Sequence, residues 1–270
     1  MQRHRPQKSE LLRKTSFGSW ITIPHPAVAE LLARAGFDWL NIDMEHSAIS
    51  LESAAELIRT IDLAGVRPFV RVGSHDTNVI KRVMDAGAHG LIASTVNTPE
   101  QAAGIVAAVR YPPAGARGVG LSRAQGYGDE FDAYYQWLNE ESIVIVQIEH
   151  IHAVKNLKAI LQVPGVDGFL IGPYDLSASL GVPGKFTHPK MLEALAEVKC
   201  VQKETKTVAG VHIVQPVVND ALQKIEDGYR FIGFGVDFLF LLNSARTGLD
   251  TIRKRNNENV GKFDDGLTLA

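Results

Sequence analysis

The sequence has little of what several classes of protein require. Its 270 residues include a single cysteine, Cys200, which excludes a disulfide framework within the chain and fits a reducing compartment. Residues 1–10 contain no apolar run of the kind that a signal peptide carries. The most apolar stretch, 231–242, is too short to cross a bilayer and contains Asp237. We therefore expect a cytoplasmic protein with no membrane partner.

The charge balance and the glycine pattern exclude further classes. The formal net charge is -2, which gives no electrostatic attraction to nucleic acid. The glycine-rich segment 115–120 has neither the Lys-Ser/Thr pair of a P-loop nor the strand–turn–helix setting of a dinucleotide site, so no nucleotide cofactor is expected. No lysine directly follows the apolar runs described below, which argues against an enzyme that forms a lysine imine with its substrate.

Short apolar runs that alternate with helical segments are what the chain does contain. Strands are predicted at 17–23, 37–44, 67–72, 90–94, 143–148, 168–171, 209–214 and 231–235. Helices are predicted at 27–35, 51–64, 76–86, 98–110, 153–161 and 217–227, and from 236 to about 254. Parallel strands need helical crossovers, and eight such units in 270 residues predict a single-domain (β/α)8 TIM barrel of the α/β class. An open doubly wound sheet is the alternative, but it more often has five or six strands.

Two segments interrupt this regular pattern. The chain is divided into an N-terminal extension at 1–16, a barrel at 17–253 and a polar C-terminal tail at 254–270. A long insertion loop at 111–141 separates the fourth and fifth strands, and loops of such length are usually functional or interface elements. The tail is expected to be disordered or to dock on a neighbouring subunit.

Two acids, Glu149 and Asp175, directly follow buried strands. In a parallel barrel the carboxyl ends of all strands meet at one mouth, where the chemistry takes place. Two carboxylates in such a position repel each other unless a proton or a cation lies between them, which predicts a divalent metal such as Mg2+ or Mn2+. The alternative is that each acid caps the following helix, which suits Asp175 better because Glu is a poor N-cap.

Further charged side chains lie at the ends of other strands. Arg71 ends the third strand and is a candidate to bind an oxyanion or a carboxylate, unless it forms a structural ion pair with a barrel acid. Asp43 and His46 follow the second strand with Glu45 between them. A carboxylate that holds an imidazole in one tautomer makes a general base, whereas the alternative is a surface histidine beside two acids. His212, inside the seventh strand, is interpreted as a packed core histidine.

Several motifs occur together in the order found in one known family. They are Ile-Asp-Met-Glu-His at 42–46, Arg-Val at 71–72, the Pro-Pro and glycine segment at 112–120, Gln-Ile-Glu at 147–149 and Gly-Pro-Tyr-Asp-Leu-Ser at 172–177. With these motifs the sequence resembles, over roughly 17–246, the HpcH/HpaI aldolases, a family of class II, metal-dependent pyruvate aldolases. Its members include 4-hydroxy-2-oxoheptanedioate and 2-keto-3-deoxy sugar-acid aldolases.

The resemblance implies an activity and an assembly. Members of this family have a (β/α)8 barrel and reversibly cleave 4-hydroxy-2-oxo acids to pyruvate and an aldehyde. The implied cofactor is Mg2+ or Mn2+, with Co2+ and Zn2+ as further candidates. The implied partners are a small 2-oxo acid, an aldehyde and other copies of the same chain, commonly in a hexamer that exchanges C-terminal helices between subunits.

The resemblance also implies roles for individual residues. Glu149 and Asp175 would bind the metal, Arg71 would hold the enolate oxygen of pyruvate, and Asp43 with His46 would form the dyad that manages the aldol proton. Backbone amides of the turn at 172–175 would bind the pyruvate carboxylate. Residues expected at the substrate are Gln147, Gly172, Pro173, Tyr174, Trp20 and Val214, with Arg123 and Tyr127 as further candidates for the aldehyde pocket.

One position departs from the family pattern. Tyr174 stands where the best-known sugar-acid and hydroxy-diacid aldolases carry a small residue, so no particular aldehyde is carried over. The same site also fits two other reactions, decarboxylation of oxaloacetate and a further carbon–carbon bond formation as in the related macrophomate synthase. A non-enzymatic barrel that binds a small acid is a third hypothesis, and the full set of candidate catalytic residues argues against it.

Overall fold

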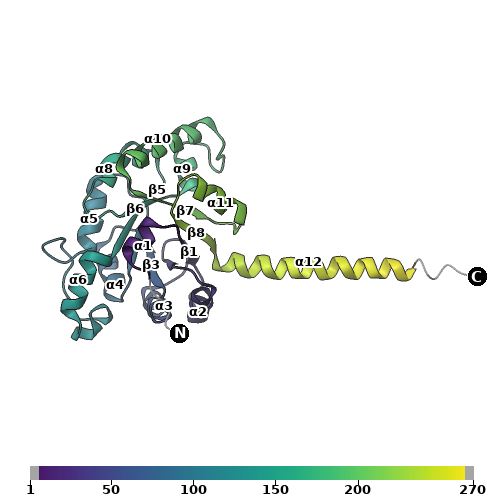
Figure 1. The fold of residues 1–270 in the computed structure, drawn as a ribbon, viewed down its shortest axis with the longest axis horizontal. Helices are drawn as coiled ribbons and strands as arrows, with labels where there is room; N and C mark the ends of the chain where they lie inside the picture. The colour runs from purple at the N-terminus through teal and green to yellow at the C-terminus, as the bar shows by residue number, and fades with distance from the viewer. Residues whose placement is uncertain (1–5, 265–270) are drawn as a thin grey trace, which may run out of the picture.

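Eight parallel strands form a closed barrel in sequence order, each hydrogen-bonded to the next and the eighth to the first (Figure 1). The computed structural model describes residues 6–264, and their side chains as far as residue 257. The strands are β1 (Ser16–Ile21), β2 (Trp39–Asp43), β3 (Arg67–Val72), β4 (Gly90–Ala93), β5 (Ile143–Ile148), β6 (Gly168–Ile171), β7 (Val208–Ile213) and β8 (Phe231–Val236). The predicted single-domain (β/α)8 barrel is confirmed.

Helices surround the barrel and connect its strands. They are α1 (Lys8–Arg13), α2 (Pro26–Ala35), α3 (Leu51–Leu63), α4 (Thr77–Asp85), α5 (Pro99–Val109), the 3-10 helix η1 (Arg123–Gly128), α6 (Phe131–Glu141), α7 (Ile151–Lys155), α8 (Leu157–Leu161), α9 (Pro173–Ser179), α10 (Pro189–Thr205), α11 (Val218–Glu226) and α12 (Asp237–Asp264). Their starts follow ordinary capping chemistry: the side chains of Ser50, Asp76 and Thr98 each accept a backbone N–H from the first turn of the following helix.

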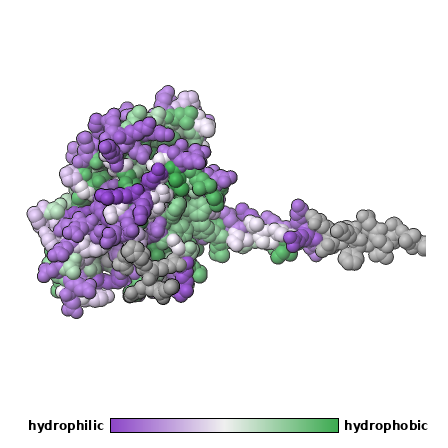
Figure 2. Space-filling model, viewed as in Figure 1, coloured by the Kyte–Doolittle hydropathy of each residue, from purple (hydrophilic) through white to green (hydrophobic). Residues whose placement is uncertain are grey.

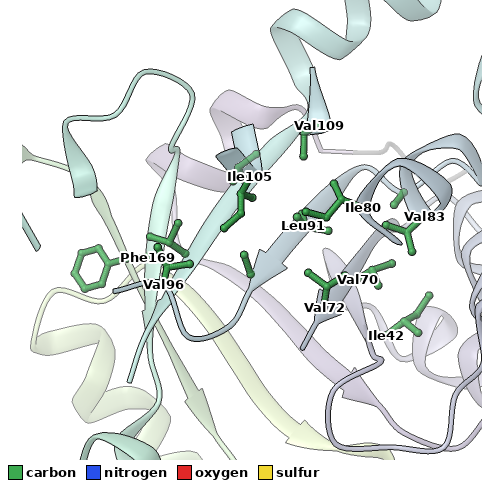
Figure 3. Packing of buried hydrophobic residues seen from close by; sticks show 14 of the residues in the cluster. Ile42, Val70, Val72, Ile80, Val83, Leu91, Val96, Ile105, Val109 and Phe169 are labelled. Atoms are coloured by element: carbon green, nitrogen blue, oxygen red, sulfur yellow. The ribbon is translucent and has the colours of Figure 1, made fainter. Parts of the chain in front are cut away.

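Aliphatic side chains fill the layer between the barrel and the helices. Strand residues that point outward pack against the inner faces of the helices, so both elements bury their apolar sides. Figure 3 shows part of this layer, with Ile42, Val70, Val72, Leu91 and Phe169 from the strands, Val96 after β4, and Ile80, Val83, Ile105 and Val109 from α4 and α5.

Aromatic rings fill the N-terminal half of the barrel interior. The ring of Trp39 stacks on that of Phe231 with centroids 4.0 Å apart, and Phe69 packs against both. Glycine makes room for these rings, since a Cβ on Gly18 would lie 2.0 Å from Trp39 Cδ2. Leu11 of α1 joins the same buried cluster from below. This end of the barrel is therefore closed, and an open site has room only at the C-terminal end of the strands.

Several elements differ from the predictions. Residues 8–13 of the predicted extension form α1, and Lys8 Nζ lies 2.6 Å from Asp167 Oδ1. The insertion at 111–141 contains η1 and α6, and no prediction covered α9 or α10, which lie between β6 and β7. The last helix, predicted to end near residue 254, runs to Asp264. No glycine or proline in 249–260 marks an end near residue 254. Residues 265–270 of the predicted tail lie outside the described residues.

Helix α12 points away from the barrel, so that most of its length stands clear of the body (Figures 1 and 2). Its apolar side chains Leu241, Leu242, Leu249 and Ile252 are exposed. Throughout residues 6–264, no helix has both the length and the apolar character that a membrane crossing requires.

Candidate active site

A cavity of about 330 Å³ opens at the C-terminal ends of the strands. All of the predicted site residues except Glu149, Arg123 and Tyr127 line it. They are Trp20, Asp43, His46, Arg71, Gln147, Gly172, Pro173, Tyr174, Asp175 and Val214. Glu149 lines an adjoining cavity of about 360 Å³, and His46 and Asp175 border both spaces. The two cavities therefore meet at His46 and Asp175, and the barrel gathers the residues that the sequence placed at its mouth.

Arg71 and Asp43 form a buried ion pair between adjacent strands. Arg71 Nε donates to Asp43 Oδ1 at 3.0 Å and Nη2 donates to Oδ2 at 2.5 Å. Burial alone would raise the pKa of Asp43, but the hydrogen bond and charge of Arg71, with the amides of His46 and Glu45, lower it overall. The ion pair predicted as the alternative for Arg71 is thus present. Arg71 Nη1 nevertheless keeps no protein partner among the described residues, so it is free to bind an oxygen in the cavity.

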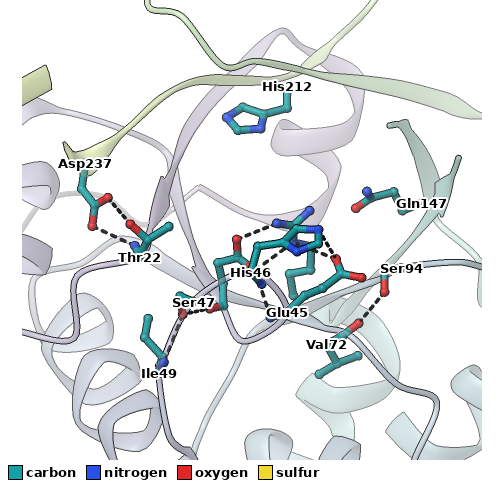
Figure 4. A network of polar contacts seen from close by, with 12 residues as sticks. Thr22, Glu45, His46, Ser47, Ile49, Val72, Ser94, Gln147, His212 and Asp237 are labelled. Carbon is teal, nitrogen blue, oxygen red and sulfur yellow. Dashed lines mark hydrogen bonds and ion pairs between the residues drawn. The ribbon is translucent and has the colours of Figure 1, made fainter. Parts of the chain in front are cut away.

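The predicted contact between the carboxylate of Asp43 and the ring of His46 is not formed. Asp43 Oδ1 accepts the backbone N–H of His46 at 3.1 Å, while His46 Nε2 lies 3.6 Å from Glu45 Oε2 (Figure 4). The reason is that Arg71 already occupies both oxygens of Asp43. Glu45 also lies 3.3 Å from Arg71 Nε, so it connects the arginine and the imidazole. The side chain of His46 is largely exposed at the mouth, where a substrate can reach it.

Glu149 is a buried carboxylate held only by uncharged donors. The backbone N–H and the hydroxyl of Thr95 donate to Oε1 at 2.5 and 2.8 Å, and Gln147 Nε2 donates to Oε2. Within the described residues no lysine or arginine pairs with it. Burial, together with the charge of Glu45, raises the pKa of Glu149 despite these hydrogen bonds. The ionised form is therefore poorly compensated in the protein as it stands.

Asp175 lies in the first turn of α9, next to Glu149. The N-cap of this helix is Gly172, which makes no side-chain cap bond, so the alternative that Asp175 caps α9 is wrong. A Cβ on Gly172 would lie 2.8 Å from Glu149 Oε2, and glycine is therefore needed for the turn to approach that carboxylate. Asp175 shares the lining of the second cavity with Glu149, and its carboxylate has no hydrogen-bond partner in the described part of the chain.

These residues fit a divalent cation. A cation between Glu149 and Asp175 would compensate the buried charge that no described basic residue balances. Among residues 6–264 no group of three His, Cys, Asp or Glu side chains gathers as a ready metal cluster. Mg2+ commonly uses one or two carboxylates and completes its shell with water and substrate oxygens, so two carboxylates are sufficient. The uncharged oxygen Gln147 Oε1 is buried there without a hydrogen-bond partner.

His212 belongs to the site, although the sequence predicted only a packed core residue. Its ring stacks on Trp20 with centroids 3.9 Å apart and planes 9° apart, and it lines the main cavity. Nε2 lies 3.0 Å from the carbonyl oxygen of Gly235, so this nitrogen carries the proton. Burial lowers the pKa of His212 to about 4, with a smaller contribution of the same sign from Arg71, while Gly235 and Asp43 oppose the shift. The ring is uncharged at neutral pH.

The half-buried, uncharged ring of His212 predicts a pH-dependent loss of stability. The unfolded chain binds a proton on this histidine below its ordinary pKa of 6.5, whereas the folded protein does not until about pH 4. The free energy of unfolding should therefore decrease as pH falls from about 6.5 to about 4, by at most about 3 kcal/mol from this group. Urea unfolding between pH 4.5 and 7.5 should show a shallower decrease for His212→Phe than for the wild type; equal slopes would contradict the assignment.

Other residues could not be placed correctly from sequence. Thr95 was missed because it lies after β4 in a left-handed conformation, φ 54°, that aims both of its donors at Glu149. Arg123 and Tyr127 were candidates for the aldehyde pocket, but they line a separate cavity of about 490 Å³ beside α6. Arg123 pairs there with Asp62 at 2.5 Å. Nothing in the glycine-rich sequence around these two residues indicated which side of the barrel the insertion covers.

The comparison with known proteins agrees with this geometry. A model of the family described as HpcH/HpaI aldolase/citrate lyase matches residues 16–244. The chain belongs to this family, which confirms the resemblance seen in its motifs. Its curated relatives are named aldolases, and the chain is an enzyme of the carbon–carbon lyase class.

Individual relatives cover most of the chain. The hydroxypyruvate/pyruvate aldolase of Roseobacter denitrificans is 37% identical over 236 residues, which are 87% of this chain and 91% of that protein. The 4-hydroxy-2-oxovalerate aldolase of Rhodococcus jostii is 38% identical over 225 residues, 83% of this chain and 86% of the relative. A crystal structure of an HpcH/HpaI aldolase/citrate lyase family protein from Burkholderia cenocepacia has a TM-score of 0.86 at 36% identity and covers 91% of this chain and 98% of its own.

Proposed function

We propose that this enzyme is a class II aldolase that reversibly cleaves a 4-hydroxy-2-oxo acid to pyruvate and an aldehyde with the help of a divalent cation. The observation that carries the proposal is the buried carboxylate of Glu149, which shares a cavity lining with Asp175 and has no basic partner among the described residues. This cavity adjoins the one that Arg71 lines. The family and the names of the relatives support the same reaction class.

Glu149 and Asp175 would hold the cation, and their oxygen donors favour Mg2+ or Mn2+ over Co2+ or Zn2+. When bound, such an ion supplies Lewis-acid polarisation of the 2-oxo carbonyl. Gln147 donates to Glu149 and so fixes the orientation of that carboxylate. The backbone amides of Tyr174 and Asp175 belong to the first turn of α9, which lines the main cavity, and they would bind the substrate carboxylate.

Arg71 would stabilise the charge that develops during cleavage. As the C3–C4 bond breaks, its electron pair moves into the enolate of pyruvate and negative charge accumulates on the 2-oxo oxygen. The free Nη1 of Arg71 is available to donate a hydrogen bond to that oxygen, and Asp43 holds the guanidinium in place through two hydrogen bonds. The arginine therefore needs little reorganisation when the charge appears.

His46 would take the proton of the C4 hydroxyl as the aldehyde forms. It lies at the junction of the two cavities, within reach of both the main pocket and Asp175. Glu45, at 3.6 Å from Nε2, would orient the imidazole, and Asp43 would fix the backbone on which it stands. In the reverse direction the same ring would return the proton to the new hydroxyl.

Identification of the products tests the proposal directly. The purified enzyme with Mg2+ or Mn2+ should release pyruvate and one equivalent of aldehyde from a 4-hydroxy-2-oxo acid. Release of pyruvate and CO2 from oxaloacetate, with no aldehyde from any hydroxy-oxo acid, would favour the decarboxylase alternative. If neither kind of substrate is turned over, the proposed function is wrong and the hypothesis of a non-enzymatic barrel that binds a small acid is favoured.

We also propose that α12 docks on other copies of the chain. Its leucines and isoleucine are exposed in the part of the chain that the structure describes, and a helix gains most of its stability from packing its apolar side chains against other elements. Light scattering coupled to size-exclusion chromatography should give a multiple of the 29.5 kDa chain mass, with a hexamer as the expected value. Leu249→Glu with Ile252→Glu should reduce that mass and Asp250→Ala should not. A monomeric wild type would contradict the docking.

A further inference from the structure

The wall of the main cavity formed by β1, β7, β8 and the residues just after them carries two polar side chains, His212 and Thr22, beside the apolar Trp20, Val214, Val236 and Phe238. The hydroxyl of Thr22 already donates to Asp237 Oδ1 at 2.7 Å. The imidazole lies flat on Trp20, and its Nε2–H donates to the carbonyl of Gly235, so the ring is fixed in both position and tautomer. A fixed tautomer leaves Nδ1 as an unprotonated acceptor.

That acceptor is free to bind a ligand. Among the described residues Nδ1 has no hydrogen-bond partner, and it is not one of the buried polar atoms that are cut off from solvent. His212 lines the same cavity as Arg71 and Asp43, the ion pair whose arginine would stabilise the enolate. A neutral acceptor in this position can pair with a hydroxyl group, whereas it offers nothing to a methyl or methylene group.

We infer that His212 is a specificity-determining residue that accepts, through Nδ1, a hydrogen bond from a substrate hydroxyl beside the carbon–carbon bond that is made or broken. The inference rests on the aldolase function proposed above. The hydroxyl has two sources: the 3-hydroxyl of a donor such as hydroxypyruvate, or a hydroxyl on the carbon next to the aldehyde carbonyl, as in glycolaldehyde. In both cases an uncharged hydroxyl group donates a hydrogen bond to the uncharged ring nitrogen Nδ1.

Two matched pairs of substrates separate these sources. In the condensation direction, pyruvate is compared with hydroxypyruvate at one fixed aldehyde, and acetaldehyde is compared with glycolaldehyde at one fixed donor. The measured quantity is the ratio of kcat/KM for the hydroxylated member to that for the plain member. His212→Phe preserves the stacking on Trp20 but removes both nitrogens, while His212→Asn places an amide oxygen near the position of Nδ1.

In His212→Phe the ratio should fall by about 3- to 10-fold in one of the two pairs, the loss expected for one neutral hydrogen bond. In His212→Asn most of the preference should return. The pair that responds identifies which hydroxyl is bound. Unchanged ratios in both pairs for a folded His212→Phe, or a fall that His212→Asn does not reverse, would overturn the inference.

The same data distinguish this inference from the function on which it rests. Turnover of pyruvate with acetaldehyde by the wild type and by both variants would show that the aldolase function holds, whatever the ratios do. No condensation product from the wild type would refute the proposed function itself. Circular dichroism and thermal unfolding at pH 7.5 show whether each variant is folded. If His212→Phe does not fold, His212→Leu replaces it as the variant without a ring nitrogen, and its ratios are compared with those of His212→Asn.

Discussion

Glu149→Gln is expected to abolish metal-dependent cleavage while leaving the protein folded and at least as stable as the wild type without metal. The amide has nearly the shape of the carboxylate but no charge, so it binds a divalent cation poorly. If the cation supplies several kcal/mol of transition-state stabilisation, its loss reduces kcat by at least about 10³-fold. Stability should not decrease, because burial disfavours the ionised form of Glu149 and no described basic residue offsets that cost.

The two readouts separate a metal ligand from a residue that only supports the fold. Pyruvate release measures activity, and thermal unfolding in EDTA measures the metal-free protein. Added Mg2+ or Mn2+ should raise the unfolding temperature of the wild type and not that of the variant. Glu204→Gln, which removes an exposed carboxylate paired with Lys158, is the matched control and should change neither quantity. Retention of metal-dependent activity in Glu149→Gln would contradict its role.

Arg71→Met is expected to reduce kcat by about 10²- to 10³-fold, the loss typical when a donor to a developing oxyanion is removed. The same change also leaves Asp43 buried without its partner, which typically costs about 3–5 kcal/mol of stability. The single variant therefore cannot distinguish a catalytic loss from partial unfolding.

The double variant Arg71→Met with Asp43→Asn resolves this ambiguity. It removes both charges of the pair, so most of the lost stability should return, but the donor to the substrate oxygen remains absent. Activity should stay as low as in Arg71→Met while urea unfolding moves back toward the wild type. If activity returned together with stability, Arg71 would be a structural residue and not a stabiliser of the enolate.

Most of the barrel and its mouth follow from short-range patterns in the sequence. Apolar runs of four to eight residues marked the strands, and the parallel topology then brought Arg71, Glu149 and Asp175 to one end. These positions needed no knowledge of side-chain geometry, because every parallel strand of a barrel ends at the same mouth.

The sequence could not show which of several neighbouring side chains each site residue would bind. Asp43 lies near both His46 and Arg71, and only the register of β2 against β3 decides that the guanidinium takes its two oxygens. Thr95 contacts Glu149 because its backbone is in the left-handed conformation, which a threonine in the sequence does not predict. His212 shows the same limit, since a histidine flanked by valine and isoleucine gives no sign that one ring edge opens to a cavity.

The length of α12 was underestimated for a related reason. The polar composition after residue 253 suggested a tail, yet a helix needs an apolar stripe only where it packs, and 249–260 contain no residue that breaks a helix. The insertion at 111–141 was recognised as unusual, but the cavity that Arg123 and Tyr127 line beside α6 depends on contacts far apart in the sequence.

We propose that Glu149 and Asp175 hold a divalent cation that this enzyme needs to cleave a hydroxy-oxo acid. The most direct measurement is pyruvate release by EDTA-treated enzyme from 4-hydroxy-4-methyl-2-oxoglutarate and 4-hydroxy-2-oxoheptanedioate, before and after Mg2+ or Mn2+ is added back. We predict no release without metal and saturable release from at least one substrate with it. Equal release with and without the ion would show that cleavage does not depend on a cation at Glu149 and Asp175.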